Sequence, residues 1–233
     1  LAEFGIEKVW PTEVGHHGFI TFRLFGHELA ESLTYRLVSP SDEVYDSVRT
    51  YWYNSGYVFA TFFFENAEFG LYDMQVVDGA NTVTLEDAVT VTEIYGTMSV
   101  RIDTPKFYRP GRTGTATVYV ENRGGNDGMA PLVRVRADQA GIRLGNSGPY
   151  TGSVEYFAIS VNYPPGVYMP GVSQPKTIRV KPDNDAEVVT LTVEFMSDTN
   201  SNTDWAGLRG DLRPPGASSE AWDAVYDNFL AGL

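Results

Sequence analysis

Apolar and polar residues alternate along most of this chain, and the alternation is clearest in residues 113–137. Ala116, Val118 and Val120 occupy every second position of one run, and a similar run covers residues 132–135. A period of two is typical of a β-strand with one face on an apolar core. The sequence RGGNDG between the runs is rich in glycine and too polar to be buried. We therefore expect it to form a wide antiparallel turn in solvent.

The first 95 residues repeat this pattern of short strands and frequent turns. Clusters of Gly, Pro, Asn, Asp and Ser separate about seven or eight alternating runs, which is the spacing of a β-sandwich. Dense Tyr and Phe also favour half-buried strands over helices. We predict strands at residues 4–9, 19–25, 33–38, 48–53, 57–64, 70–77, 82–85 and 88–94.

The strand pattern stops at Tyr95-Gly96 and restarts two residues later, so we place a domain boundary there. The predicted domains are one sandwich over residues 1–95, a second over 96–197, and a linker with a C-terminal helix over 198–233. The fold class is therefore all-β: two immunoglobulin-like β-sandwich domains with a short C-terminal α-helix. Further strands of the second sandwich are predicted at residues 98–102, 141–144, 154–161, 177–180 and 188–195.

The helix is predicted at Glu220–Leu230, with Ser218 or Ser219 as its N-cap. Its apolar residues recur at i, i+3, i+4, i+7 and i+8, which places them on one stripe. A helix of about eleven residues is marginal alone in water, so the stripe must pack on something. We expect Trp222 and Phe229 to contact either the second sandwich or a partner.

Composition narrows the classes of function. The formal net charge of −13 disfavours nucleic acid and anionic membranes as partners, because binding to phosphates needs clustered Lys and Arg. The chain has no Cys, which excludes disulfides, zinc–thiolate sites and thiol nucleophiles. No run of 18 apolar residues is present, so we predict no membrane insertion. The start at Leu1, without Met, suggests a piece of a longer protein.

The sharpest local pattern places oxygen ligands at every second residue, in Asp198, Asn200, Asn202 and Asp204. This resembles the first half of a calcium loop, since a hard cation takes six to eight oxygens from a tightly curved chain. The sixth position is Thr203 in place of Gly, which departs from that loop. The twelfth position is not the bidentate Glu of that loop. A solvated linker is the alternative, and Asp183-Asn184-Asp185 favours a turn. Calcium is the sole cofactor that the sequence suggests.

Aromatic residues gather in one predicted hairpin. Strict alternation puts Tyr51 and Tyr53 on one face and Trp52 on the other, with Tyr57 on the next strand. An exposed aromatic face would bind sugar rings by stacking, whereas a covered face would pack on the core or on a neighbouring domain or loop. Glycan binding and packing therefore both stay open.

Other reactive side chains give no site. His16 and His17 are adjacent on a turn, and neither they nor His27 has an evident third ligand, so solvent-facing histidines are favoured over a metal site. No nucleophile elbow is present. An isopeptide crosslink from Lys106 or Lys176 is not favoured by any pattern. We predict that the protein is not an enzyme.

Two stretches carry a resemblance to known families. GHHGFITFRLFG and GLYDMQVVD in the first block resemble immunoglobulin-like modules of the IPT/TIG type. RPGRTGTATVYVENRGGND in the second resembles the adhesion-related sandwich modules called CARDB. The resemblance implies tandem modules of a giant, secreted or cell-surface, bacterial protein. It implies an adhesive or structural role, with neighbouring modules or other surface proteins as partners, and it carries over no catalytic residue.

Overall fold

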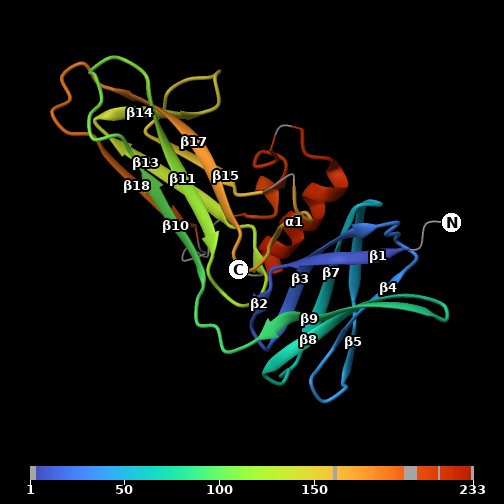
Figure 1. The fold of residues 1–233 in the computed structure, drawn as a ribbon. Coiled ribbons are helices and arrows are strands. Elements are labelled where there is room, and N and C mark those ends of the chain that lie inside the picture. Colours follow the sequence, from blue (N-terminus) through green and yellow to red (C-terminus); the bar gives the residue numbers. More distant parts are fainter. Residues whose placement is uncertain (1–3, 160–161, 197–203, 215, 232–233) are drawn as a thin grey trace. The chain divides into compact units, whose positions relative to one another are not determined.

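The structure is a computed structural model that describes residues 4–159, 162–196, 204–214 and 216–231 (Figure 1). The chain forms two compact units. Unit 1 consists of Leu1–Thr97, Asn122–Gly128 and Asn162–Val172, and unit 2 consists of Met98–Glu121, Met129–Val161 and Ser173–Leu233. The predicted division had placed the two inner segments of unit 1 in the second domain. We call them the 122–128 segment and the 162–172 segment.

Unit 1 is an immunoglobulin-like sandwich of two sheets. Lettered in chain order, the sheets have the strand orders A-B-E-D and A′-G-F-C-C′, because the first strand is divided between them and its second part pairs in parallel with the last strand. The first sheet is β1 (Gly5–Trp10), β3 (Gly18–His27), β7 (Tyr57–Phe64) and β6 (Arg49–Asn54). The second sheet is β2 (Glu13–Val14), β9 (Asn81–Val91), β8 (Gly70–Asp78), β4 (Thr34–Val38) and β5 (Val44–Asp46).

The core of unit 1 is aromatic, and its polar tips are hydrogen-bonded. Tyr72 is fully buried near the start of β8, and its hydroxyl donates to the carbonyl of Glu68 at 3.0 Å. A tyrosine that bonds back to the preceding corner is a hallmark of immunoglobulin-like sandwiches. Tyr35 likewise donates to the carbonyl of Ala30 at 2.8 Å. Burial raises the pKa of both tyrosines to about 12, so both hydroxyls stay protonated and able to donate at neutral pH.

The expectation that RGGNDG lies in solvent is wrong. Gly124 and Gly125 are buried, and the 122–128 segment packs backbone against backbone on the rest of unit 1. Gly15 donates its N–H to the carbonyl of Gly125 at 2.7 Å, and Asp127 donates its N–H to the carbonyl of Phe19 at 2.8 Å. Glycines permit this approach, because a Cβ on Gly125 would lie 2.6 Å from the nitrogen of Gly15. Main-chain hydrogen bonds thus satisfy a polar segment that the sequence pattern assigns to solvent.

Asn122 joins the two inserted segments of unit 1. This residue is 3% exposed, and its side-chain nitrogen donates to the carbonyls of Asn126 at 2.8 Å and Tyr168 at 2.6 Å. Its side-chain oxygen accepts from the N–H of Gly124 at 2.9 Å, and its own N–H donates to the carbonyl of Val172 at 2.9 Å. A buried side chain with each polar atom paired fixes one conformation of both segments.

Unit 2 is a second sandwich, and residues 116–120 and 132–135 form its centre as the alternation predicts. Opposite charges pair across neighbouring strands of its second sheet, where the Nε atom of Arg134 lies 2.9 Å from a carboxylate oxygen of Glu155. The first sheet is β10 (Met98–Asp103), β11 (Gly114–Asn122), β17 (Ser173–Pro182) and β14 (Ala140–Leu144). The second sheet is β15 (Ser153–Phe157), β13 (Leu132–Asp138) and β18 (Thr190–Phe195). A separate two-stranded ladder pairs β12 (Gly128–Met129) with β16 (Val167–Tyr168), and β16 belongs to the 162–172 segment of unit 1.

The predicted C-terminal helix is confirmed as α1 (Ser219–Ala231), preceded by the short 3-10 helix η1 (Gly207–Arg209). The hydroxyl of Ser218 accepts from the N–H of Ala221 at 3.2 Å, which is the expected N-cap. The apolar stripe packs within unit 2 on Phe157, whose ring centroid lies 5.0 Å from that of Trp222 and 5.0 Å from that of Phe229. In the part of the chain that the structure describes, no helix is both long and apolar enough to cross a membrane.

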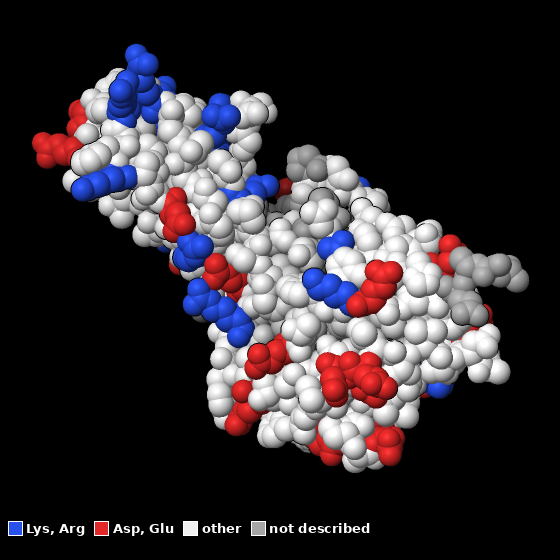
Figure 2. All heavy atoms as spheres, viewed as in Figure 1, with Lys and Arg blue, Asp and Glu red and all other residues white. Residues whose placement is uncertain are grey.

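Charge is divided unevenly between the units. Unit 1 carries sixteen acidic and five basic residues, a net charge of −11, and unit 2 carries fourteen acidic and twelve basic residues, a net charge of −2. In Figure 2, acidic side chains outnumber basic ones over the visible face of unit 1. Lys and Arg side chains gather instead on unit 2, toward the end where Figure 1 labels β14.

The packing of the 122–128 segment predicts a specific sensitivity to added bulk. We expect Gly125→Ala to lower the free energy of unfolding of unit 1 by about 1–3 kcal/mol, because the new methyl group would force two backbones apart. Chemical denaturation followed by tryptophan fluorescence measures this change. Gly152→Ala is the matched control, since a Cβ there meets nothing within 4 Å. Equal stability of both variants would contradict the backbone contact.

Candidate functional site: an aromatic surface on unit 1

The outer face of the first sheet of unit 1 carries aromatic residues from three strands. The strand register sets Arg23 of β3 opposite Phe59 of β7, and Phe25 opposite Tyr57. It sets Tyr51 of β6 opposite Phe59 from the other side. Residues opposite one another point to the same face of a sheet. All five side chains therefore point away from the core, and the alternate residues of each strand point into it.

Arg23 lies at the centre of this face. Its guanidinium carbon is 4.1 Å from the ring centroid of Tyr57, 4.8 Å from that of Phe25 and 5.7 Å from that of Phe59. These are cation–π distances, and such contacts strengthen as water is removed. The Nε atom of Arg23 is buried and has no hydrogen-bond partner. The arginine therefore lies against ring faces, and none of the ion pairs found among the described residues includes it.

A bulge in β6 presents two further aromatic residues. The register shifts between Trp52 and Asn54, and Tyr53 at that point stacks on Tyr57 with centroids 4.5 Å apart and ring planes 18° apart. Tyr53 is 53% exposed and Trp52 is 51% exposed. The indole N–H of Trp52 donates to the carbonyl of Leu29 at 3.1 Å, which orients the ring. Trp52 lies opposite Val58, whose side chain is in the core, so its indole is on the other face of the sheet, at the edge. We call Arg23, Phe25, Tyr53 and Tyr57 the aromatic surface.

The remainder of the same face is covered from within unit 1. Tyr163 of the 162–172 segment has its ring centroid 6.1 Å from that of Phe59 and 6.4 Å from that of Trp10. Phe59 is consequently only 2% exposed. Tyr51 is partly buried and accepts a hydrogen bond from Arg49 at 3.0 Å. One part of this face is thus covered by a loop, and another part is exposed to solvent.

The other predicted surface residues lie inside unit 2. Trp222 is 2% exposed and Phe229 is 9% exposed, both against Phe157. The indole N–H of Trp222 donates to the carbonyl of Arg209 at 2.7 Å. These two residues therefore pack in cis and do not form a surface open to a partner.

The predicted calcium loop lies almost wholly outside the described residues. Asp198, Asn200 and Asn202 fall in that part of the chain. Asp204 is exposed, and its carboxylate accepts from the N–H of Gly207 at 3.0 Å, as in a turn. No group of three or more His, Asp or Glu side chains suited to a metal is present among the residues that the structure describes.

The histidines take part in local contacts. The rings of His16 and His17 meet edge to face with centroids 5.0 Å apart, and His16 also meets the ring of Phe69 at 5.1 Å. His27 lies 3.6 Å from a carboxylate oxygen of Glu7. The structure brings no third ligand to the adjacent pair within its described part.

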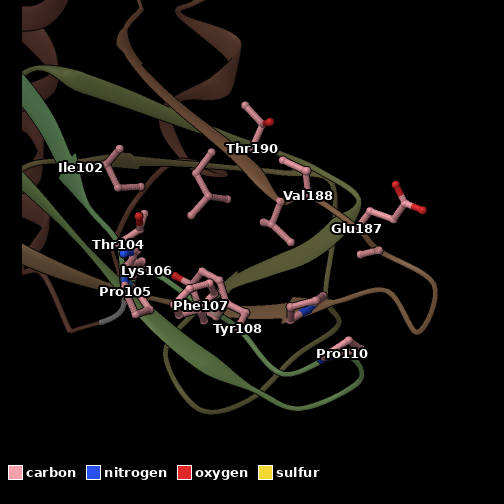
Figure 3. A pocket seen from close by; sticks show the side chains of 14 residues that line it. Ile102, Thr104, Pro105, Lys106, Phe107, Tyr108, Pro110, Glu187, Val188 and Thr190 are labelled. Carbon is pink, nitrogen blue, oxygen red and sulfur yellow. The ribbon is translucent and has the colours of Figure 1, made fainter.

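Unit 2 has a groove that the sequence did not indicate. The cavity has a volume of about 630 Å³ and lies between the connection that follows β10 and the connection that precedes β18 (Figure 3). Phe107 is 81% exposed and Val188 is 65% exposed at its rim, while the carboxylate of Glu187 points away from the other labelled side chains. Glu187 is the one acid among its lining residues, so the groove lacks the pair of carboxylates that a glycosidase needs.

A carboxylate is enclosed where the 122–128 segment meets β3. Asp127 accepts hydrogen bonds from the backbone N–H of Thr21 at 3.0 Å, and its other oxygen lies 2.6 Å from the Thr21 hydroxyl. That hydroxyl lies 2.8 Å from the hydroxyl of Thr61. Burial raises the pKa of the Asp127 carboxyl to about 7, although the hydrogen bonds from Thr21 oppose the rise.

Comparison with known proteins adds little beyond this geometry. No protein-family model matches the chain, and no curated protein matches its sequence. Solved structures give matches of low similarity. The extracellular region of plexin A4 has a TM-score of 0.34 at 10% identity, over 80% of this chain and 13% of that one.

Two bacterial-type surface proteins give similar values. The Yersinia pseudotuberculosis adhesin InvE has a TM-score of 0.28 at 16% identity, over 82% of this chain and 55% of that one. Domains 4 and 5 of the S-layer protein SbsC have a TM-score of 0.30 at 17% identity, over 75% of this chain and 77% of that one. The chain thus spans about an eighth of plexin A4 and about half of the adhesin. Similarity at this level indicates no shared function.

Asp127 predicts how the stability of unit 1 depends on pH. The folded protein keeps the proton up to about pH 7, whereas the unfolded chain releases it near the ordinary value of 3.8. Because the folded state binds more protons between these values, the free energy of unfolding falls as pH rises from about 4 to about 7. We expect a fall of roughly 2–4 kcal/mol from this residue, measured by denaturation at each pH.

The amide variant isolates this contribution. Asp127→Asn keeps the shape and accepts from Thr21 but carries no ionisable proton, so the difference between wild type and variant should follow the pH. The pKa of Asp127 is set by burial and by the hydrogen bonds from Thr21. Other groups titrate alike in both proteins, so the difference measurement cancels them. Asp78→Asn, an exposed carboxyl, should keep the wild-type profile. A flat difference for Asp127→Asn would refute the enclosed carboxyl.

Proposed function

We propose that this chain is a non-enzymatic structural or adhesive segment of a larger extracellular or cell-surface protein, acting through protein–protein contacts. The observation that carries the proposal is the aromatic surface on unit 1. Tyr53 is about half exposed and stacks on Tyr57, whose ring contacts Arg23, on a hydrogen-bonded sheet. Trp, Tyr and Arg are the residues that most often supply binding energy at protein interfaces.

The way these side chains are held supports this role. Tyr53 is stacked on Tyr57, and Arg23 is held against the rings of Tyr57 and Phe25, so little side-chain freedom is lost when a partner binds. Arg23 has ring faces in place of a carboxylate, and its charge stays available to a partner. A rigid, amphipathic surface of this composition suits a docking role for one module among many.

Glycan binding by the exposed aromatics of the same hairpin, around Tyr51 to Tyr57, is the second candidate. The exposed indole of Trp52 favours it, since a sugar ring stacks on a flat aromatic face. Against it, one face of the Tyr53 ring is already occupied by Tyr57, which leaves less free aromatic area than two open rings would give. We therefore rank a protein partner first.

A photo-crosslinking amino acid at Tyr53 tests the proposal. On the surface fraction of the source cells, we expect covalent capture of a protein and loss of binding by about tenfold or more when Tyr53→Ala and Tyr57→Ala are combined. Tyr95→Ala is the matched control, because Tyr95 is 84% exposed in unit 1 but outside the aromatic surface. Capture of glycan alone would support the second candidate, and equal binding by all variants would contradict both.

A further inference from the structure

The strand register of unit 2 sets two arginines against each other. Arg143 of β14 lies directly opposite Arg179 of β17. Their neighbours Ile142 and Val180 are fully buried, so the arginines share the outer face of the sheet. Like charges opposite one another destabilise a strand pair unless something neutralises them. The pair therefore indicates a place for negative charge.

Both guanidinium groups are held in position by local contacts. The guanidinium carbon of Arg143 is 4.5 Å from the ring centroid of Tyr150, and one of its terminal nitrogens donates to the carbonyl of Gly148 at 3.0 Å. Arg179 donates through Nε to the side-chain oxygen of Asn146 at 2.8 Å. The Nε atom of Arg143 is buried and has no hydrogen-bond partner. Donors thus remain free on both arginines for a ligand.

A third cation and a fixed ring complete the arrangement. The Nζ atom of Lys181 is 6.0 Å from the centroid of Tyr150. The hydroxyl of Tyr150 lies 2.7 Å from that of Thr113, and the ring base sits over Gly141, where a Cβ would come within 2.7 Å of Tyr150. Tyr150 therefore packs against the sheet in space that a side chain at position 141 would fill. We call Arg143, Arg179, Lys181 and Tyr150 the basic cluster.

No carboxylate comes within ion-pair distance of these three cations among the described residues, in contrast with other arginines of the chain. Arg36 pairs with Asp46 at 2.6 Å, and Arg101 pairs with Asp103 at 2.6 Å. Arg209 contacts both Asp223 and Asp227. The protein has an excess of acidic residues, yet within the described part of the chain none of them pairs with these three adjacent cations. Their charge is therefore available to a ligand from outside unit 2. Figure 2 shows basic side chains gathered over this end of the unit.

We propose that the basic cluster binds the carboxylates of an acidic polypeptide, with one carboxylate between Arg143 and Arg179. Planar guanidinium groups bind carboxylates through paired hydrogen bonds, and a neighbouring lysine adds charge without demanding a fixed geometry. Charge complementarity favours an acidic polypeptide as the partner, similar in charge to unit 1, whose net charge is −11. Unit 2 is nearly neutral and therefore does not repel such a partner. This site lies apart from the aromatic surface.

The test uses a fluorescent oligo-glutamate peptide and the full chain, with binding read by anisotropy at about 0.15 M salt, where the Debye length is about 8 Å. We expect saturable binding that weakens at higher salt and is about tenfold weaker in Arg179→Glu. Lys176→Glu is the matched control, since it makes the same charge change on the same strand and should bind as wild type. Arg179→Lys should bind more weakly than wild type but better than Arg179→Glu.

Two arms separate this inference from the proposed function and from other ligands. The Tyr53→Ala, Tyr57→Ala double variant should bind oligo-glutamate as wild type does, so loss of the aromatic surface and loss of the basic cluster give different results. Oligogalacturonate presents carboxylates on a sugar chain, and we expect it to bind more weakly. No binding of oligo-glutamate, equal binding by Arg179→Glu, or tighter binding of oligogalacturonate would each overturn the inference. Circular dichroism of each variant confirms folding.

Discussion

The hydrogen bonds of Asn122 are the interaction on which unit 1 depends. Its side chain ties the 122–128 segment to Tyr168, and its backbone ties it to Val172. Through these bonds the RGGNDG turn closes on Gly15 and Asp127 reaches Thr21, while Tyr163 covers Phe59. The immunoglobulin-like sandwich of unit 1 is thereby completed by two later segments, the first of which begins 25 positions after Thr97. An unpaired amide at this position would leave several buried groups without partners.

The sequence was sufficient for elements whose periodicity is strong. Alternation located the strands, and the i, i+3, i+4 stripe located α1, because both patterns follow from which side chains must leave water. It was not sufficient for the RGGNDG segment. Burial there comes from main-chain hydrogen bonds between glycines, and no apolar side chain signals it. Segments that are buried by their backbones look like loops in a sequence.

The candidate sites were predictable to different degrees. Trp52 and Tyr53 were found by aromatic density, but the bulge that stacks Tyr53 on Tyr57 and the segment that covers Phe59 depend on tertiary contacts. Arg143 and Arg179 are 36 positions apart, and only the strand register places them opposite each other. A run of basic residues would have drawn notice, whereas two arginines on separate strands do not.

The division of unit 1 into three stretches of chain has a consequence for how the protein folds. Domains generally form in order as a chain emerges from the ribosome. The strands of the first sandwich are complete by Val91, but the segments that cover its outer face end at Val172. Thr21 must therefore wait for Asp127, 36 residues after Val91, and Phe59 for Tyr163, 72 residues after Val91, before either is covered. Contacts of such long sequence separation slow folding, so unit 1 should reach its native state late, together with unit 2.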